Sequence, residues 1–151
     1  MLKDPSVEIR SISSEQTFAI RHPVLRAGRP LESSKFAGDN EKETHHFGAY
    51  TNNKLIGVLS CYQNNCSLLM DGKNYQIRGV AVLESHQKKG IGKALMLHAE
   101  EFLSQINCNH IWLNARLKAK DFYTKLCYEE IGTVFEVVDI GPHQCFIKKL
   151  S

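Results

Sequence analysis

The fold is decided by residues 75–106, which read YQIRGVAVLESHQKKGIGKALMLHAEEFLSQI. The first part, residues 75–83, is an apolar run with the length and composition of a buried strand. The last part has apolar residues at steps of three and four, which predicts a helix with one buried face. These residues are Ile91, Leu95, Ala99, Phe102 and Ile106. The stretch therefore predicts a strand that leads through a glycine-rich turn into an amphipathic helix.

The glycine-rich turn has the features of an anion-binding site. Gly90 and Gly92 lack a Cβ, so a ligand can approach the backbone closely. The first N–H groups of a helix have no partner within the helix, and they lie at the positive end of its dipole. Lys88, Lys89 and Lys93 add positive charge there. A helix start without a ligand remains an alternative on this segment alone.

The spacing of the glycines excludes two common nucleotide-binding motifs. A mononucleotide P-loop needs a glycine five residues before Gly92 and a Ser or Thr after Lys93, and the chain has Gln87 and Ala94 there. A dinucleotide-binding fingerprint needs a third glycine where Leu95 stands. The remaining pattern is Q-x-x-G-x-G after a strand and at the start of a helix.

This pattern resembles the pyrophosphate loop of the GNAT superfamily of CoA-dependent N-acyltransferases. Residues 112–132, WLNARLKAKDFYTKLCYEEIG, resemble the second motif of the same superfamily, with Cys127 where a glycine is usual. The pieces VLRAGRP, KFAGD, THHFGA and GPH are similar to a poorly characterised bacterial subgroup. Together the matches cover most of the chain.

The order of expected elements agrees with this resemblance. We expect one domain, residues 1–151, of the mixed α+β class, with a mainly antiparallel sheet of six or seven strands and helices on both faces. Ser13 and Gln16 form a capping box for a helix from about Ser14 to Arg21, and Pro23 makes its continuation uncertain. Residues 27–44 are rich in turn formers and predict a long functional loop.

Composition limits the other functions. The net charge of +3 is too small to indicate nucleic-acid binding, and no run approaches the ~20 apolar residues of a membrane span. The N-terminus lacks the apolar region of a signal peptide, so a cytoplasmic protein is expected. Five cysteines without a CxxC pair indicate buried free thiols rather than disulfides or a metal site. No metal cofactor is expected.

The resemblance implies acetyl-CoA as the cosubstrate and a set of residues that hold it. Backbone amides of the loop would bind the pyrophosphate, the preceding strand would pair with the pantetheine arm, and a side-chain amide would bond the pantetheine amides. The amide of Val82 would also donate to the thioester oxygen. The residues implied are Val80, Ala81, Val82, Gln87, Lys88, Lys89, Gly90, Ile91, Gly92, Lys93 and Asn114.

The resemblance also implies a group that assists the leaving thiolate. Tyr123 occupies the position of the family's frequent general acid. Its reference pKa of ~10 exceeds the ~8.5 of a thiol, so full proton transfer is uphill by about 2 kcal/mol. We therefore expect Tyr123 to stabilise the forming thiolate by a hydrogen bond. The base that takes the ammonium proton is left open between His143, in the GPH turn, and Glu84, just after the cofactor strand.

The expected function is direct transfer of an acetyl group from acetyl-CoA to a primary amine of a small molecule or a protein. The expected partners are a CoA thioester and an amine acceptor, without nucleic acid or membrane, and the chain is expected to be a monomer or a homodimer. The alternative is a non-catalytic CoA-binding or regulatory module of the same fold. Release of free CoA in the presence of amines would separate the two.

Overall fold

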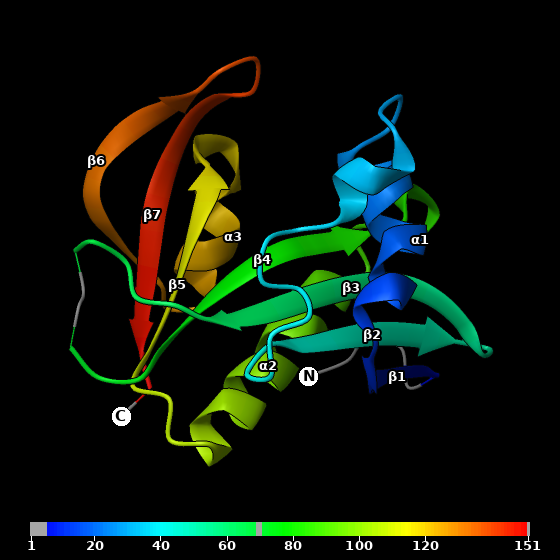
Figure 1. The fold of residues 1–151 in the computed structure, drawn as a ribbon, viewed down its shortest axis with the longest axis horizontal. Coiled ribbons are helices and arrows are strands. Elements are labelled where there is room, and N and C mark those ends of the chain that lie inside the picture. Colours follow the sequence, from blue (N-terminus) through cyan, green and yellow to red (C-terminus); the bar gives the residue numbers. More distant parts are fainter. Residues whose placement is uncertain (1–5, 69–70, 151) are drawn as a thin grey trace. The chain divides into compact units, whose positions relative to one another are not determined.

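A computed structural model describes residues 6–68 and 71–150, which form three helices, three short 3-10 turns and seven strands (Figure 1). The strands are β1 (Val7–Ile12), β2 (His45–Thr51), β3 (Lys54–Gln63), β4 (Asn74–Val82), β5 (His110–Arg116), β6 (Glu129–Val137) and β7 (Gly141–Lys149). The helices are α1 (Ser14–Leu25), α2 (Ile91–Gln105) and α3 (Lys120–Lys125). The 3-10 turns are η1 (Leu31–Ser34), η2 (Glu84–His86) and η3 (Leu117–Ala119).

The strands form one sheet in the order β1-β2-β3-β4-β5-β7-β6. β4 and β5 run parallel through three residue pairs, from Asn74 with His110 to Gln76 with Trp112. The pairs β1–β2, β2–β3, β5–β7 and β6–β7 are antiparallel. A parallel pair needs a long crossover, and α2 supplies it between β4 and β5. The expected mixed, mainly antiparallel sheet is confirmed.

The β2–β3 hairpin follows directly from the local sequence. Asn52 and Asn53 form a two-residue connection, and both have positive φ, 50° and 61°. Hairpins of this length favour turns in which both central residues are left-handed, and Asn tolerates that conformation better than most residues. The pattern of two apolar runs around an Asn pair therefore sets the register of this part of the sheet.

Helix α1 is longer than its sequence predicts. The capping box is present, with Ser13 Oγ accepting from the Gln16 N–H and the Gln16 side chain accepting from the Ser13 N–H. The helix does not end near Arg21, however, but continues through Pro23 to Leu25. A proline inside a helix costs a hydrogen bond, so packing must hold the last turn. Buried Ile20 contributes that packing through a core cluster with Val58 and Ala81.

By contact density the chain divides into two compact units. Of the described residues, unit 1 comprises 6–62 and 77–102, and unit 2 comprises 63–68, 71–76 and 103–150. In unit 1, helices α1 and α2 pack on opposite faces of the sheet. Val58 on β3 meets Ile20 of α1, whereas a Cβ built on the neighbouring Gly57 would lie 3.2 Å from Ile91 Cγ2 of α2. A single domain over residues 1–151 stays a prediction.

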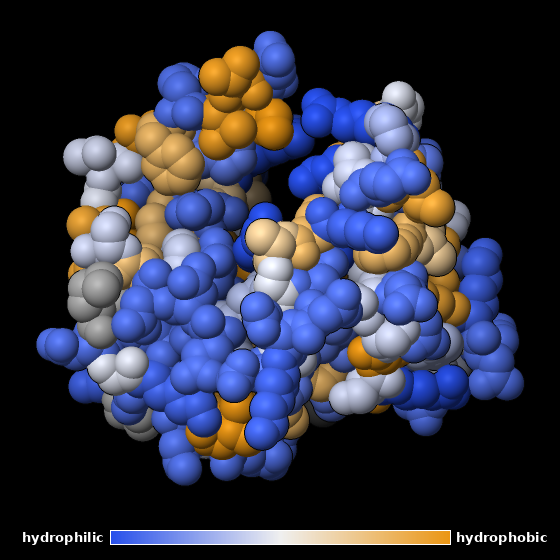
Figure 2. Space-filling view, viewed as in Figure 1, coloured by the Kyte–Doolittle hydropathy of each residue, from blue (hydrophilic) through white to orange (hydrophobic). Residues whose placement is uncertain are grey.

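In unit 2, strands β5, β7 and β6 carry helix α3 on one face. Tyr123 of α3 lies with its ring centroid 5.7 Å from that of Phe146, a β7 residue that pairs with Leu113 of β5. Apolar side chains are exposed over the end of the β6–β7 hairpin, where Figure 2 shows a hydrophobic cluster. Val138 and Ile140 in this hairpin are 84% and 43% exposed.

Candidate active site

The turn before α2 presents a row of backbone N–H groups without backbone partners. Within the described residues, no backbone hydrogen bond outside the helices and strands uses an N–H from Lys88 to Lys93. The first helical bond of α2 runs from the Ala94 N–H to the Gly90 oxygen, at 3.0 Å. Lys88 and Gly90 have positive φ, 64° and 84°. Successive N–H groups in such a turn form a concave anion-binding nest.

Two features hold this loop in place. The Gln87 side-chain amide donates to the Val82 carbonyl at 2.9 Å, and the Gln87 N–H donates to the Glu84 oxygen at 3.3 Å. The side chains of Lys88, Lys89 and Lys93 are exposed. Gln87, expected as a cofactor residue, thus fastens the loop to the end of β4.

The strand segment Val80–Val82 lies in unit 1 directly before this loop. Ala81 is buried, whereas Val80 and Val82 are half-buried. The Leu83 N–H donates to the Ile56 oxygen at 2.9 Å, which ties the end of β4 to β3. Glu84 begins η2 and is exposed.

Tyr123 is held firmly in unit 2. Its ring contacts the rings of Phe122, Tyr128 and Phe146 at centroid distances of 4.9, 5.9 and 5.7 Å. Burial raises the pKa of Tyr123 to about 12. The residue is 8% exposed. The residue remains a neutral hydrogen-bond donor at physiological pH.

The end of α3 fixes this tyrosine through a Schellman motif. The Cys127 N–H donates to the Thr124 oxygen and the Tyr128 N–H donates to the Tyr123 oxygen, both at 3.0 Å. Cys127 has a φ of 71°, the left-handed conformation for which this position normally takes glycine. The turn that the superfamily builds with glycine is therefore kept with a cysteine. Cys127 is also exposed, unlike the buried thiol that was expected.

Asn114 and Tyr123 lie on opposite faces of the unit 2 strands. Asn114 pairs with Cys145 of β7, whereas Tyr123 contacts Phe146, the next residue of the same strand. Directly paired residues share a face, and successive residues of a strand alternate between faces. Asn114 and Cys145 also line a cavity of about 560 Å³ together with Trp112. The structure does not bring these two predicted site residues together.

His143 lies on the same face as Asn114. It pairs with Arg116 of β5 and with Phe135 of β6, and its ring centroid is 5.8 Å from that of Phe135. Its Nδ1 is 2.9 Å from the Gly141 carbonyl, an acceptor, so Nδ1 carries a proton. In the neutral ring Nε2 is then free to accept a proton, as a general base requires.

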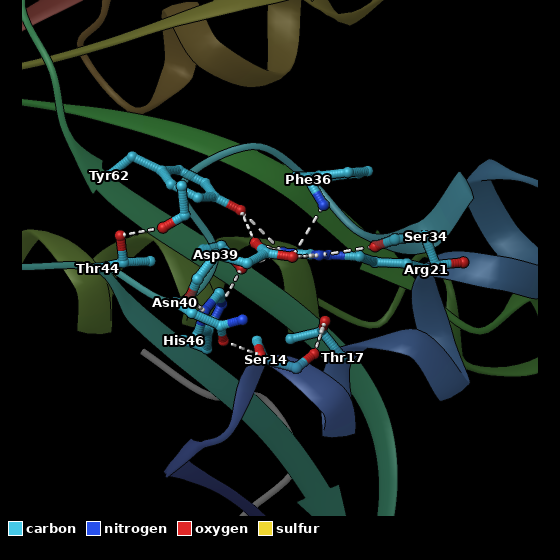
Figure 3. Close-up of polar contacts among 12 residues, drawn as sticks. Ser14, Thr17, Arg21, Ser34, Phe36, Asp39, Asn40, Thr44, His46 and Tyr62 are labelled. Atoms are coloured by element: carbon cyan, nitrogen blue, oxygen red, sulfur yellow. Dashed lines mark hydrogen bonds and ion pairs between the residues drawn. The ribbon is translucent and has the colours of Figure 1, made fainter. Parts of the chain in front are cut away.

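A buried ion pair in unit 1 was not anticipated from the sequence. Figure 3 shows Arg21 of α1, Asp39 of the α1–β2 loop and Tyr62 of β3 pointing toward one another. Arg21 donates to the two Asp39 oxygens at 2.7 and 3.1 Å, and to Tyr62 Oη at 2.9 Å. Arg21 also donates to the Ser34 carbonyl at 2.9 Å. These bonds fasten the loop of residues 27–44 to the sheet.

The cluster sets the ionisation of its members. Burial raises the pKa of Asp39, but hydrogen bonds from Arg21, Tyr62 and the Phe36 N–H outweigh it and hold the pKa below its ordinary value. Burial and the bond to Asp39 raise the pKa of Tyr62 to about 12. Burial lowers the pKa of His46, whose Nε2 bonds the Asp39 carbonyl at 2.9 Å. The cluster therefore combines Arg21 as a cation, Asp39 as an anion and His46 as a neutral ring.

A weak sequence signal for this cluster exists. The buried residues of α1 include Ser14, Thr17 and Arg21, which recur at steps of three and four like an apolar stripe. Their polar character hides the stripe from a search for hydrophobic periodicity. The loop itself was predicted to be functional, and it borders a cavity of about 500 Å³ lined by Phe18 of α1 and by Phe36, Asp39 and Glu41 of the loop.

Comparison with known proteins identifies the family. A family model described as the acetyltransferase (GNAT) family matches residues 8–127. The chain belongs to this family. An uncharacterized N-acetyltransferase, YitI of Bacillus subtilis (strain 168), is similar to the GNAT chain, with 33% identity over 144 residues that cover 95% of this chain and 97% of the relative. The predicted class of enzyme, an acyltransferase of the N-acetyltransferase type, is confirmed.

Solved structures of other proteins share the fold of the GNAT chain. FeeM, an N-acyl amino acid synthase from uncultured soil microbes, is 12% identical with a TM-score of 0.79, over 97% of the GNAT chain and 92% of its own. An aminoglycoside 6'-N-acetyltransferase complexed with coenzyme A is 14% identical with a TM-score of 0.76, over 95% and 97% of the two chains. The predicted fold class is confirmed.

The described residues of the GNAT protein were also compared with the requirements of a membrane span and of a metal site. None of those in residues 6–68 and 71–150 is long and apolar enough to cross a membrane. Within the same residues, no three or more His, Cys, Asp or Glu side chains gather as ligands for a metal ion.

Proposed function

We propose that the chain transfers an acetyl group from acetyl-CoA directly to a primary amine of a small molecule or a protein, without a metal, in the cytoplasm. A C–N bond forms as the amine attacks the thioester carbon, and the C–S bond breaks to release CoA thiolate. The ammonium gives one proton to a base on the protein before attack, and the nitrogen loses a second proton as the amide forms, which the departing thiolate takes up directly or through water. One domain, residues 1–151, carries the activity, as a monomer or a homodimer.

The observation that carries the proposal is the row of unpartnered N–H groups from Lys88 to Lys93. Six amide donors lie in the turn before α2 and in its first three residues, with three exposed lysines among them, and this arrangement fits a pyrophosphate. Gly90 and Gly92 leave room for its oxygens. Val80, Ala81 and Val82 would pair with the pantetheine arm through their backbone, and the Val82 N–H would donate to the thioester oxygen. Asn114 remains a proposed donor to the pantetheine amides.

Tyr123 is proposed to donate a hydrogen bond to the departing thiolate. Its pKa of about 12 lies well above the ~8.5 of a thiol, so complete proton transfer would be uphill by about 5 kcal/mol. The raised pKa thus favours stabilisation by a hydrogen bond over general-acid catalysis. We expect Tyr123→Phe to lower kcat with little change in CoA affinity.

Two groups stay candidates for the base, His143 and Glu84. The free Nε2 of His143 favours it, because its Nδ1 is already occupied by the Gly141 carbonyl. Covalent catalysis by Cys145 is disfavoured, because burial raises the pKa of its thiol to about 11. Burial also raises the pKa of Cys108, so neither thiol supplies a thiolate nucleophile at neutral pH.

A substitution at Gly92 tests the pyrophosphate site. Gly92→Ala adds a methyl group where the pyrophosphate would approach, and it replaces glycine in a helix by the best helix former. We expect CoA affinity to fall by about tenfold, since a lost charged hydrogen bond is worth about 1.5 kcal/mol or more. The melting temperature should not fall. The measurements are titration calorimetry with CoA and thermal unfolding without it.

Free CoA released in the presence of a panel of amines tests catalysis. Release above the amine-free rate supports the transferase, and tight CoA binding without any release supports a non-catalytic module instead.

Lys54→Ala in the β2–β3 hairpin is the control for Gly92→Ala, because Lys54 is exposed and lies outside the proposed site. Unchanged CoA affinity in Gly92→Ala would contradict the proposed loop.

A further inference from the structure

Three guanidinium groups surround one aromatic ring in unit 1. The Arg21, Arg78 and Arg26 Cζ atoms lie 4.0, 5.0 and 5.1 Å from the centroid of the Phe36 ring. Arg78 also lies 5.4 Å from the centroid of Tyr62. A guanidinium near a ring face is attracted by the ring quadrupole, and one such contact is common. Three cations at one ring repel one another, so the arrangement calls for a negative partner.

Among residues 6–68 and 71–150, only one of these three cations has a carboxylate partner. Arg21 is fully buried and pairs with Asp39 at 2.7 Å. Arg26 and Arg78 are half-buried, and in the described chain neither has a carboxylate within ion-pair distance. Asp39 is already used by Arg21, Tyr62 and the Phe36 N–H. Within this part of the chain, two partly desolvated cations are therefore left without a counter-charge.

Neighbouring charges make the region more positive still. Burial, and then the charges of Arg29, Arg78 and Arg21, lower the pKa of Arg26. No acidic group offsets these effects at Arg26. A half-buried cation without a stabilising carboxylate beside it binds an external anion well, because partial removal of water strengthens the attraction between the two charges.

The position of Arg78 relates this positive site to the proposed chemistry. Arg78 lies on β4, two residues before Val80, where the strand segment proposed to face the thioester begins. Val82 is four residues from Arg78, at most about 13 Å along an extended strand. Gly79, between them, has a φ of 67°, and a Cβ there would lie 3.0 Å from Phe36 Cε2. Phe36 thus packs directly on the strand beside both arginines.

We infer that Arg26 and Arg78, together with the Phe36 ring, form a binding site for an oxyanion of the acceptor, so that the preferred amine carries a carboxylate or a phosphate. The inference rests on the proposed function and names the class of its acceptor. Each planar guanidinium can donate two parallel hydrogen bonds to such a group. The anion would be held at Arg26 and Arg78 while the amine at the other end of the molecule reaches the thioester.

The first test measures binding without turnover. Benzoate, phenyl phosphate and the neutral benzamide are titrated calorimetrically into protein saturated with CoA, so that the loop of residues 88–93 is not available to the anions. Wild type should bind benzoate or phenyl phosphate and not benzamide. Arg78→Gln and Arg26→Gln should weaken that binding about tenfold or more. Arg78→Lys should weaken anion binding less, because lysine keeps the positive charge and loses only the pair of parallel hydrogen bonds that a guanidinium donates.

Arg10→Gln is the matched control for these variants. Arg10 also lies over an aromatic ring, 4.3 Å from the Tyr50 centroid, but its own carboxylate partner Glu8 is 2.6 Å away. Its replacement should leave anion binding unchanged. Equal binding of benzoate and benzamide by wild type overturns the inference, as does binding that survives Arg78→Gln in a protein with an unchanged melting temperature. These results stand whether or not any amine is acetylated.

The second test uses pairs of amines that differ only in the anionic group. β-Alanine is compared with β-alaninamide, and O-phosphoethanolamine with ethanolamine, by the release of CoA. Arg78→Gln should raise KM for the anionic member of a pair and leave kcat/KM of the neutral member and CoA affinity unchanged. Transfer that shows no preference for either anion overturns the inference but leaves the proposed function intact. A parallel loss of CoA affinity would instead assign the arginines to a CoA phosphate.

Discussion

At the residue scale, single groups keep the predicted site in a defined state. Tyr123 is neutral, His143 has one nitrogen occupied, and the buried cluster around Asp39 has one anion and one cation. Each state follows from burial or from hydrogen bonds rather than from the residue type alone. Substitutions at Cys127 and His46 test how local conformation and ionisation affect stability.

Cys127 stores backbone strain at the end of α3. A non-glycine residue in the left-handed conformation costs roughly 1–2 kcal/mol, whereas glycine has no such cost and loses more entropy on folding. We therefore expect Cys127→Gly to stabilise the protein by about 1 kcal/mol, or a few degrees in melting temperature. Cys127→Ala keeps the strain and should give no gain. A lower melting temperature for Cys127→Gly would contradict this account of the turn.

His46 should make the protein sensitive to mild acid. Its pKa is lowered in the folded state, so between that value and the ~6.5 of the unfolded chain the unfolded state binds more protons. Stability should therefore fall as the pH drops below about 6.5. In the neutral ring, His46 Nδ1 accepts a hydrogen bond from the Ser60 hydroxyl, whose oxygen lies 2.6 Å away and itself accepts from Arg21. Protonation of His46 would place a second proton between Nδ1 and that oxygen, so the hydroxyl would have to turn away.

The measurement for His46 is the urea midpoint as a function of pH. The wild-type midpoint should decline between about pH 7 and pH 5, and His46→Gln should flatten that decline. The lowered pKa of Asp39 has the same sign, and its contribution is present above about pH 4 and is lost below. A flat wild-type curve down to pH 5 would exclude the role given to His46.

At the element scale, the sequence predicted β4, its turn and α2 well, and the α1–β2 loop poorly. The strand was predicted from its apolar run and the helix from its apolar residues at steps of three and four, and the structure has a strand and a helix there. The loop was recognised by its turn residues, but the buried Asp39 that anchors it was not. Its partner Arg21 is 18 residues away, beyond any local pattern.

Gly79 connects the loop to β4 and gives a test of that contact. Gly79→Ala would bring a Cβ within 3.0 Å of Phe36 Cε2 and would also place alanine at a positive φ. Gly28→Ala places alanine at a similar φ, 78°, with nothing within 4 Å. Gly28→Ala should thus cost about 1–2 kcal/mol for backbone strain alone, and Gly79→Ala should cost more.

The two alanine variants are compared by chemical denaturation and by hydrogen exchange. Only Gly79→Ala should speed exchange in residues 27–44, because only it displaces Phe36. An equal loss of unfolding free energy in the two variants would mean that the Phe36 side chain can move away from the new Cβ without loss of packing.

At the scale of the whole molecule, the boundaries between the two units fall inside secondary-structure elements. They lie after residue 62 in β3, after residue 76 in β4 and after residue 102 in α2. Neither unit can unfold without breaking hydrogen bonds of those elements. We therefore expect one cooperative transition, as for most single domains of this size, with equal calorimetric and van't Hoff enthalpies. Two resolved transitions would contradict the single domain predicted for residues 1–151.

The sequence by itself determined the family, the glycine-rich turn before α2 and the order of elements, because these depend on local period, glycine spacing and short-range caps. Only the tertiary structure decided which distant side chains meet. It placed Asn114 and Tyr123 on opposite faces and gathered Arg26 and Arg78 around Phe36. Such contacts join residues far apart in the chain, and packing of whole elements selects them. No periodicity of one element can specify its partners on another.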